Sequence, residues 1–557
     1  MKIIIRIRTD EYAEYKSIVV DGPIRLSDLA EQCEKELHYG ALIANVNCRN
    51  RELDYIIEED SNVTLFDMST QLGSQTYRSS LLMIYMRAIF EIYGDINVIV
   101  ENSLNQGILS SICFDREVNQ EDIAAIYAKM IEIVQADLPF GCEMIDRDNA
   151  INFCKHRGLD EKVSLLEDVP KNAMIEYYNL DGYVNFFYGY MVPSTRYVQS
   201  FELRAYQDGI LLRFPDSTYP DEIPTFRDDY KIYEAFLKTK MWRKSIGIEY
   251  LADLNKVISN GEVKELIEKN ELFLEEQLDQ SVDEIIRSGR RIILIAGPSS
   301  SGKTTFAKKL CDRISKLTAE PLYLGSDDYF LDRDETPLGA DGKPDYESLP
   351  AIDLNMFNTQ LNDLLEGKEV DIPSYNFLSG KKEFGERSVS INSNQLIVIE
   401  GIHGLNNVLT SGVQEKEKYR IYISVFAKLG IDRHNRVSSS DTRLLRRMIR
   451  DHRTRGASAE KTLENWYKVR SGEERNIFPY SNYADFVYNS TMVYETAIIK
   501  KYARPLLEDI SPDSPQYGEA LRLLYFLEPF YEIESDKDIP EESIIREFIG
   551  EKDALID

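Results

Sequence analysis

A glycine-bounded, serine-rich loop is the stretch of this sequence whose residue types point most directly to chemistry. "GPSSSGKT", from Gly297 to Thr304, satisfies the pattern GxxxxGK[ST]. Glycines let such a loop curl until its backbone N–H groups point inward, and the helix that follows adds partial positive charge. In this pattern the Lys303 ammonium can bind the β and γ phosphates, and the Thr304 hydroxyl can be a ligand of Mg²⁺. We expect ATP and Mg²⁺ to bind at this loop, which comprises Gly297, Pro298, Ser299, Ser300, Ser301, Gly302, Lys303, Thr304 and Thr305.

Two acidic residues follow short apolar runs further along the chain. Asp327 comes just after "LYLG", and Glu400 ends "QLIVIE". If both runs are strands of one parallel sheet, their carboxyl ends meet at the edge where such sheets bind ligands. A carboxylate at Asp327 can accept the proton of an attacking hydroxyl. We therefore expect Asp327 and Lys303 to be catalytic, and Thr304, Asp327 and Glu400 to form the metal environment.

A run of arginines stands out in an otherwise acidic chain. "DTRLLRRMIRDHRTRG" covers residues 441–456 and contains six arginines. The spacing of Arg443, Arg446, Arg447 and Arg450 puts them on one helical face, opposite an apolar face. This pattern is typical of a lid helix that closes over transferring phosphates and stabilises their charge. The alternative is a basic helix that pairs with the chain's own acids.

The segments around the loop predict the elements that position it. "RIILIA" has the composition of a fully buried strand, and "TTFAKKLCDRISKL" has Phe306, Leu310 and Ile314 on one helical stripe. The runs at 322–324 and 396–399 add two more buried strands. We expect an α/β fold in which a doubly wound parallel sheet has helices on both faces.

Length and composition limit the other possibilities. A chain of 557 residues is too long for one core, and a net charge of −29 disfavours binding to nucleic acid or to an anionic membrane. The six cysteines form no CxxC pair, which is typical of reduced thiols in a cytoplasmic protein. No apolar run approaches the ~20 residues that span a bilayer, and no targeting signal is visible.

Changes in pattern along the chain predict five regions. Residues 1–68 alternate strand, helix and strand, which favours a β-grasp module; here "KIIIRIR" and "YKSIVV" form a hairpin, and Ser27 caps the helix in "RLSDLAEQCEKEL". Residues 69–225 mix helix and strand in an α+β domain. Residues 226–285 form a charged helical connector, 286–505 hold the loop, and 506–557 form a helical extension.

The first two regions resemble parts of threonyl-tRNA synthetase. "ANVNCRNRELDYIIEEDSNVTLFD" is similar to its TGS domain, and residues 69–225 resemble its second additional domain, which edits mischarged tRNA. Such editing sites hold zinc through an HxxxH pair and a later Cys/His pair. The matching stretches here, "YRSSL" (77–81) and "GYMVPST" (189–195), contain no histidine or cysteine. We expect the scaffold without its metal chemistry.

The C-terminal half resembles the uridine kinase and phosphoribulokinase family of P-loop kinases. The resemblance covers residues 290–490, and the whole chain is similar to a bacterial nucleoside kinase subgroup with TGS-like and synthetase-like regions; "SIIREFIG" fits that subgroup too. The motifs, in family order, are "AGPSSSGKTTFAKKL", "SDDYF", "DYESLPAIDL", "IPSYNF", "IVIEGIHGLN" and "DTRLLRRMIRDHRTRG".

This resemblance implies roles for individual residues. Asp327 matches the general base, Glu347 a ribose-binding carboxylate and Tyr375 a tyrosine that contacts the base. Arg446, Arg450 and Arg455 match lid arginines at the donor, and Arg447 lies beside them at the acceptor. Gly380 stands where uridine kinases have a base-selecting histidine, so the identity of the nucleoside base is left open.

Three functions follow. The first is an ATP- and Mg²⁺-dependent kinase that phosphorylates the 5′-hydroxyl of a uridine- or cytidine-like nucleoside. The second is a sugar-phosphate kinase of the phosphoribulokinase type, with Lys381 and Lys382 near the acceptor. The third is an RNA-associated regulatory protein that binds ATP. We expect the partner to be a small-molecule nucleoside, and we expect no binding to a membrane. Binding to nucleic acid is disfavoured. The sequence leaves open whether the protein forms a homo-oligomer and whether ATP or GTP is the donor.

Overall fold

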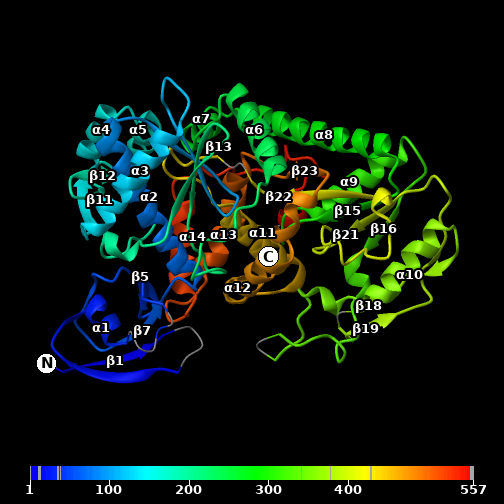
Figure 1. Ribbon diagram of the computed structural model, residues 1–557, viewed down its shortest axis with the longest axis horizontal. Helices are drawn as coiled ribbons and strands as arrows, with labels where there is room; N and C mark the ends of the chain where they lie inside the picture. Colours follow the sequence, from blue (N-terminus) through cyan, green and yellow to red (C-terminus); the bar gives the residue numbers. More distant parts are fainter. Residues whose placement is uncertain are drawn as a thin grey trace.

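A computed structural model describes residues 2–9, 14–33, 37, 39–339, 342–376, 378–426 and 429–551 (Figure 1). The N-terminal sheet lies at the lower left of Figure 1, the second region above it, and the parallel sheet with its helices at the right. Among the described residues, no helix is both long and apolar enough to cross a bilayer. The chain is a mixed α/β protein, as the sequence predicts.

The first region is a five-stranded mixed sheet with one helix against it. The strand order is β2-β1-β7-β4-β5, in which β1 pairs antiparallel with β2 and parallel with β7. Alternate residues Ile3, Ile5 and Ile7 of β1 are buried under the helix α1. The predicted hairpin and the β-grasp arrangement are therefore confirmed. The bounds are β1 (Lys2–Arg8), β2 (Lys16–Asp21), α1 (Leu26–Gln32), β4 (Ile43–Val46), β5 (Arg49–Arg51) and β7 (Ser61–Phe66), with β3 (Ile24–Arg25) paired to β6 (Ile56–Ile57).

The predicted N-cap of α1 is wrong. Ser27 lies inside the helix, and the capping position is Arg25, whose side chain makes no capping hydrogen bond. The first N–H groups of the helix are satisfied instead by loop carbonyls, because Leu26 donates to the Tyr55 oxygen at 2.9 Å and Ser27 to the Leu53 oxygen at 2.7 Å. Tertiary contacts thus replace a local cap. Residues 34–36 of the predicted helix lie outside the described residues.

The second region consists of two antiparallel sheets and four helices. One sheet has the order β13-β14-β9-β8, and the other has the order β10-β11-β12. Helices α2 and α3 pack together over the four-stranded sheet, and their apolar residues share one core with it. The bounds are α2 (Gln71–Tyr93), β8 (Val98–Leu104), β9 (Gly107–Ile112), α3 (Gln120–Gln135), β10 (Gly141–Asp146), α4 (Arg147–His156), α5 (Asp160–Glu167), β11 (Met174–Leu180), β12 (Tyr183–Asn185), β13 (Glu202–Tyr206) and β14 (Gly209–Arg213), with a 3-10 turn at Thr195–Tyr197.

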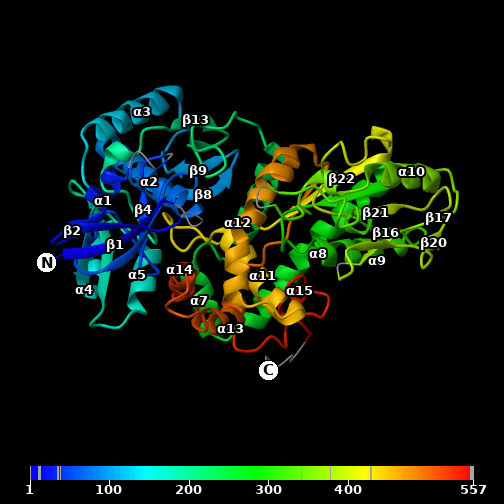
Figure 2. The ribbon, with the colours of Figure 1, turned by 90° about the horizontal axis from the view of Figure 1, so that it is seen from below.

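The third region is a parallel sheet of order β16-β21-β15-β22-β23, covered on both faces. Ile293 and Ile295 of β15 face the core shared with α8, α9, α11 and α13. Ile292 and Leu294 face the core shared with α10. Figure 2 shows α10 on one side of the sheet and α8 and α9 on the other. The predicted doubly wound sheet is confirmed, with bounds β15 (Ile292–Ala296), α9 (Lys303–Ser315), β16 (Leu322–Gly325), α10 (Leu354–Leu365), β21 (Ile397–Glu400), β22 (Lys418–Ser424) and β23 (Phe486–Asn489).

Helices before and after the sheet complete the structure. The helices α8 and α13 run through the boundaries proposed at 285/286 and 505/506. The remaining bounds are α6 (Tyr230–Ser245), α7 (Leu251–Ser259), α8 (Val263–Ser288), β17 (Val370–Asp371), β18 (Ser374–Asn376), β19 (Lys381–Glu383), β20 (Ser388–Val389), α11 (Ser439–Arg455), α12 (Ala459–Asn476), α13 (Glu495–Glu508), α14 (Tyr517–Leu527) and α15 (Arg546–Ile549), with 3-10 turns at Ser326–Tyr329, Leu349–Ala351, Glu415–Glu417 and Phe478–Tyr483.

Candidate active site

The predicted phosphate loop connects β15 to α9 at the carboxyl edge of the parallel sheet. Its backbone turns through the left-handed region at Ser300 (φ 59°) and Gly302 (φ 88°). Gly297 approaches strand β22 so closely that a Cβ atom there would lie 1.9 Å from the Ile423 carbonyl oxygen. Only glycine fits that position, so the loop geometry depends on the residue type found in the motif.

Lys303 folds across the loop that precedes it. Its ammonium donates to the carbonyl oxygens of Gly297 at 2.9 Å and Pro298 at 3.1 Å. These contacts place a positive charge at the loop, beside the first turn of α9, where the N–H groups of a helix favour anions. The loop, Lys303 and the helix N-terminus together form an anion-binding arrangement.

Acidic side chains from two neighbouring strands face this loop. Glu400, at the end of β21, accepts hydrogen bonds from the Thr304 hydroxyl at 3.1 Å and the Tyr323 hydroxyl at 2.8 Å. Asp327 lies in the 3-10 turn that follows β16. The Asp327 residue is exposed to solvent, but many protein atoms lie close to its carboxyl group and partly desolvate it. This desolvation and the nearby Glu400 raise the pKa of Asp327 to about 6, although Lys303 opposes the shift.

The turn that carries Asp327 packs tightly against the end of β21. A Cβ atom on Gly401 would lie 1.8 Å from the Ser326 hydroxyl oxygen and 2.7 Å from its Cβ. A glycine at 401 is therefore required for the two strand ends to approach. The Ser326 hydroxyl also donates to the Asp327 carboxylate at 3.2 Å, which fixes the side chain. The structure thus brings Lys303, Thr304, Asp327 and Glu400 together, as the sequence predicts.

The oxygen donors at this edge fit a magnesium ion. Mg²⁺ is usually held by one or two carboxylates together with substrate phosphates and water. Asp327 and Glu400 are close enough for Glu400 to raise the Asp327 pKa, and a cation between them would relieve that repulsion. No cluster of three or more His, Cys, Asp or Glu ligands occurs in the described part of the chain. The set of Thr304, Asp327 and Glu400 therefore suits an ion that depends on phosphate for its remaining ligands.

Glu347 and an aromatic group line the other side of Asp327. Burial raises the pKa of Glu347 to about 7, with smaller contributions from Glu473 and Asp327, while Arg447 opposes the shift. Glu347 packs against Gly472 of α12 and lies within electrostatic reach of Asp327 and Lys303.

Three aromatic rings form a wall next to that turn. The Tyr346 and Tyr375 hydroxyls are 3.1 Å apart, and both rings pack edge-on against Phe330 at centroid distances of 5.3 and 5.6 Å. The Tyr375 backbone donates to the Asp328 carboxylate, which ties strand β18 to the Asp327 turn. Sequence reasoning identified Tyr375 but missed Phe330 and Tyr346, although both occur in quoted motifs.

The arginines of α11 divide into two groups. Arg443 and Arg446 are buried under the loop, where they donate to the carbonyl oxygens of Ser299 at 3.0 Å and Ser300 at 3.2 Å. Arg446 also pairs with the fully buried Glu495. The first half of α11 is therefore a core element that supports the loop from below, and not a mobile lid. The alternative hypothesis, a basic helix paired with the chain's own acids, describes these residues better.

The second group is closer to solvent. Arg447 donates to the Ser299 hydroxyl at 2.8 Å, so it reaches the phosphate loop itself. Arg447, Arg450 and Arg455 surround Asp451, with nitrogen–oxygen distances of 3.2, 3.0 and 3.3 Å. Three positive charges around one carboxylate leave a net positive end of α11 near the loop, which is the part of this helix that suits a phosphate.

One supporting residue was not predicted at all. Glu473 of α12 is buried, pairs with Arg443, and accepts the backbone N–H of Ser299 at 2.8 Å. Its pKa stays below the ordinary value because Arg443 and Arg470 outweigh the effect of burial. Glu473 is 174 residues from Ser299, so nothing local in the sequence indicates this contact.

The stretches that correspond to the editing ligands meet in the second region, but apolar residues fill the space. The Ser80 hydroxyl accepts the backbone N–H of Val192 at 3.0 Å, so "YRSSL" lies against "GYMVPST". Tyr77, Leu81 and Met191 are all buried there. Neither stretch contains a histidine or a cysteine, which are the usual zinc ligands.

The region around Gly380 differs from the expected base pocket. Gly380 has φ 71°, and a Cβ atom there would lie 2.7–2.8 Å from atoms of Arg333. The Arg333 side chain therefore takes the space that a side chain at 380 would enter. Lys382, offered by the sugar-phosphate hypothesis, has its ammonium 2.8 Å from the Asp353 carboxylate and is largely buried.

Comparison with known proteins divides the chain in two. Residues 292–497 match the model of the phosphoribulokinase / uridine kinase family. The N-terminal part is similar to threonine–tRNA ligases: 29% identity over 188 residues with that of Clostridium novyi (strain NT), and 27% over 185 residues with that of Clostridioides difficile (strain 630). These alignments cover 34% and 33% of this chain but only 30% and 29% of the ligases, so the chain spans about a third of the length of the curated relatives it matches.

Two solved structures are similar to part of the chain. A putative fructose transport system kinase from Silicibacter sp. TM1040 is 15% identical, with a TM-score of 0.27, and the match covers 38% of this chain and 98% of that one. A possible uridine kinase from Bacillus stearothermophilus is 17% identical, with a TM-score of 0.26, and the match covers 39% of this chain and 99% of that one.

Proposed function

We propose that this protein is a nucleoside kinase that transfers the γ-phosphoryl group of ATP, with Mg²⁺, to the 5′-hydroxyl of a nucleoside. The family match supports a phosphotransferase with a P-loop. One observation supports the proposal further: Asp327, with a pKa of about 6, lies within electrostatic reach of both Lys303 at the phosphate loop and Glu347. This arrangement supports Asp327 as a general base between a donor site and an acceptor site.

We propose the following steps for these side chains. Lys303 turns from the carbonyl oxygens of Gly297 and Pro298 to the β and γ phosphates of the donor. Asp327 takes the proton of the acceptor 5′-hydroxyl as that oxygen bonds to the γ phosphorus. The bond from the γ phosphorus to the β,γ-bridging oxygen then breaks, and ADP leaves with the electron pair. A magnesium ion held by Thr304, Asp327 and Glu400 would supply charge neutralisation at the phosphates.

The residues proposed for the acceptor favour a nucleoside. Phe330 and Tyr375 are buried beside the Asp327 turn, and the partly exposed Tyr346 ring that packs on them is the apolar surface proposed to meet a base. Glu347 offers acceptors for ribose hydroxyls. A phosphorylated sugar needs a cationic subsite for its phosphate, and Lys381 and Lys382 are the two candidates. Lys382 is largely buried and pairs with Asp353, so it is not available for that role. Lys381 is exposed on the neighbouring position of β19. The absence of disulfides among the six cysteines fits the cytoplasm that we propose as its location.

An acceptor panel tests this function. The purified chain is incubated with Mg²⁺ and ATP or GTP, and with uridine, cytidine, adenosine, guanosine, ribose 5-phosphate or ribulose 5-phosphate; products are identified by mass spectrometry. The proposal predicts a nucleoside 5′-monophosphate. A bisphosphorylated sugar would support the sugar-phosphate alternative, and a salt-dependent tRNA complex without any phosphorylated acceptor would support the RNA-associated one.

A further inference from the structure

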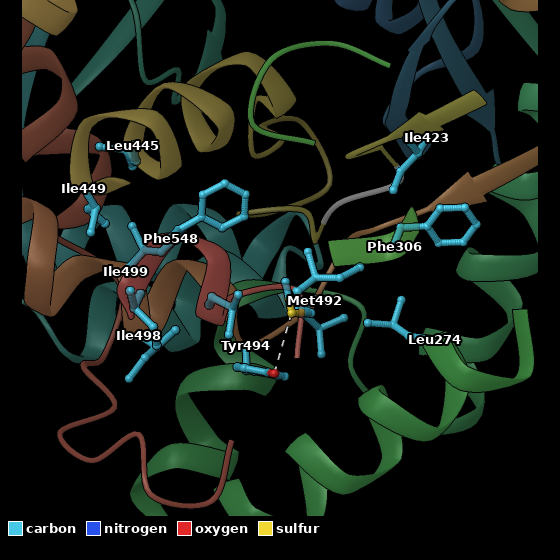
Figure 3. Packing of buried hydrophobic residues seen from close by; sticks show 14 of the residues in the cluster. Leu274, Phe306, Ile423, Leu445, Ile449, Met492, Tyr494, Ile498, Ile499 and Phe548 are labelled. Atoms are coloured by element: carbon cyan, nitrogen blue, oxygen red, sulfur yellow. Dashed lines mark hydrogen bonds between the residues drawn. The ribbon is translucent and has the colours of Figure 1, made fainter. Parts of the chain in front are cut away.

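The C-terminal segment, residues 543–550, packs against the phosphate loop. Ile545 and Phe548 are fully buried, and Figure 3 shows Phe548 among Leu445 and Ile449 of α11. The Arg446 guanidinium, which supports the loop, lies 4.9 Å from the centre of the Phe548 ring. The segment is thus built into the core next to the loop, and not loosely attached.

Two side chains of this segment reach the loop itself. Ile544 covers Gly302, where an added Cβ atom would lie 2.4 Å from an Ile544 methyl carbon. The Glu547 carboxylate accepts the Thr305 hydroxyl at 2.8 Å and the Thr305 backbone N–H at 3.4 Å. A negative charge from a distant part of the chain therefore sits at the first turn of α9, two residues after Lys303.

The groups that Glu547 uses are those that the motif reserves for a phosphate. The N–H groups in the first turn of α9 are not used within the helix and point outward with the positive end of the helix dipole. A carboxylate oxygen and a phosphate oxygen are both anionic acceptors and compete for the same donors. Two anions at one donor also repel each other. Glu547 and the phosphate chain of a nucleotide therefore cannot both occupy Thr305.

We infer that Glu547 is an autoinhibitory carboxylate, which occupies a phosphate position of the loop and has to leave Thr305 before a nucleoside triphosphate binds in full. This inference rests on the proposed function for the identity of the nucleotide. It makes the C-terminal segment a regulatory element, because anything that draws Glu547 away from the loop raises the affinity for the donor.

The backbone of the segment is held without the Glu547 side chain. Arg453 donates to the carbonyl oxygens of Glu547 at 3.0 Å and Phe548 at 3.3 Å. Arg546 pairs with the buried Asp536 and donates to the Ile539 oxygen at 3.1 Å. Replacing the Glu547 carboxylate with an amide therefore keeps the segment in place and removes only the charge. Glu542 is exposed directly before residues 543–550, so Glu542→Gln is a matched control for the loss of one negative charge.

Calorimetric titration of the full chain with ATP and Mg²⁺ tests the inference on the natural protein, Glu547→Gln and Glu542→Gln. We expect Glu547→Gln to lower the Kd for ATP by about fivefold or more, and Glu542→Gln to leave it within about twofold.

Each other outcome is informative. Equal or weaker ATP binding by Glu547→Gln would overturn the autoinhibitory role and leave the nucleotide site standing. If none of the three proteins bound ATP, both the inference and the proposed function would be wrong.

Discussion

The Thr304 hydroxyl donates to the Glu400 carboxylate across 3.1 Å, which joins the phosphate loop after β15 to the end of β21. Because β21 lies between β15 and β16 in the sheet, the same carboxylate also faces the Asp327 turn after β16. One acidic side chain thus links the group that binds the donor to the group that activates the acceptor.

The close approach of Gly401 to Ser326 makes a specific double-mutant prediction. Gly401→Ala would place a methyl group 1.8 Å from the Ser326 hydroxyl oxygen, so the Asp327 turn has to shift. We expect kcat to fall by about 10²-fold or more, with little change in ATP affinity. Ser326→Gly removes the clashing atoms, and the double variant should recover at least part of the lost rate. No recovery would show that the clash does not act through the Asp327 turn.

The pKa of Asp327 predicts the pH dependence of catalysis. Only the ionised carboxylate accepts the proton of the acceptor, and desolvation together with Glu400 raises its pKa to about 6. A magnesium ion beside both carboxylates would relieve their repulsion and lower this pKa, so the bend in the pH profile should lie at or below about pH 6. The rate constant kcat/KM for the acceptor should therefore rise with pH up to that bend and stay level above about pH 6.5. A series of initial rates between about pH 4.5 and 8.5 at saturating ATP and Mg²⁺ measures this. A rate that continues to rise above about pH 6.5 would contradict Asp327 as the base.

Glu473 supports the loop through a buried ion pair. Glu473→Gln would leave the buried Arg443 guanidinium without its counter-charge, which costs about 3–5 kcal/mol of folding free energy. We expect a clear drop in the midpoint of thermal unfolding. Glu464→Gln, on the same helix, removes an exposed pair with Lys461 and should change stability by less than about 0.5 kcal/mol. Equal effects of the two substitutions would contradict the supporting role.

Much of this site could be predicted because its pieces are local. The motif from Gly297 to Thr304, the strand before it and the helix after it are continuous in sequence. Asp327 and Glu400 could be placed because each ends an apolar run, and parallel strands end at one edge. Five strands with a shared direction then fix where the loop and the acids meet.

What the sequence could not predict depends on contacts between distant segments. The pattern of α11 showed an arginine face, but burial by α13 and α15 decides that Arg446 supports the loop from inside. Glu547 is 242 residues from Thr305. Its motif, "SIIREFIG", indicated a resemblance to a subgroup of kinases but did not predict a contact with the phosphate loop. Likewise, the sequence predicted Ser27 as the N-cap from local pattern alone. In the structure, the carbonyl oxygens of Leu53 and Tyr55 accept the first N–H groups of α1.

Glu52 predicts a pH-dependent stability at the junction of the first two regions. Its carboxyl accepts the Tyr178 hydroxyl and the Met191 N–H, both at 2.6 Å, and burial raises its pKa to about 7. The folded state therefore binds a proton more tightly than the unfolded chain, so stability is greatest below pH 4.5 and declines as the pH rises to about 7.

Glu52→Gln tests this dependence because the amide oxygen still accepts both hydrogen bonds without a charge. The substitution should have little effect at pH 5 and stabilise the protein at pH 8 by roughly 2 kcal/mol, after allowance for partial contact with water. The thermal unfolding midpoint of both proteins at the two pH values measures the difference. An equal shift at both pH values would rule out titration of Glu52 as the cause.

The most direct test of the account compares Asp327→Asn with Asp334→Asn, which changes an exposed aspartate in the same segment. Transfer of phosphate from ATP to the acceptor identified by the panel is measured under single-turnover conditions, and ATP affinity is measured on the same samples. The account predicts that Asp327→Asn binds ATP normally but transfers phosphate at least about 10²-fold more slowly, while Asp334→Asn matches the natural protein. Phosphate transfer by Asp327→Asn at the natural rate would contradict the central claim.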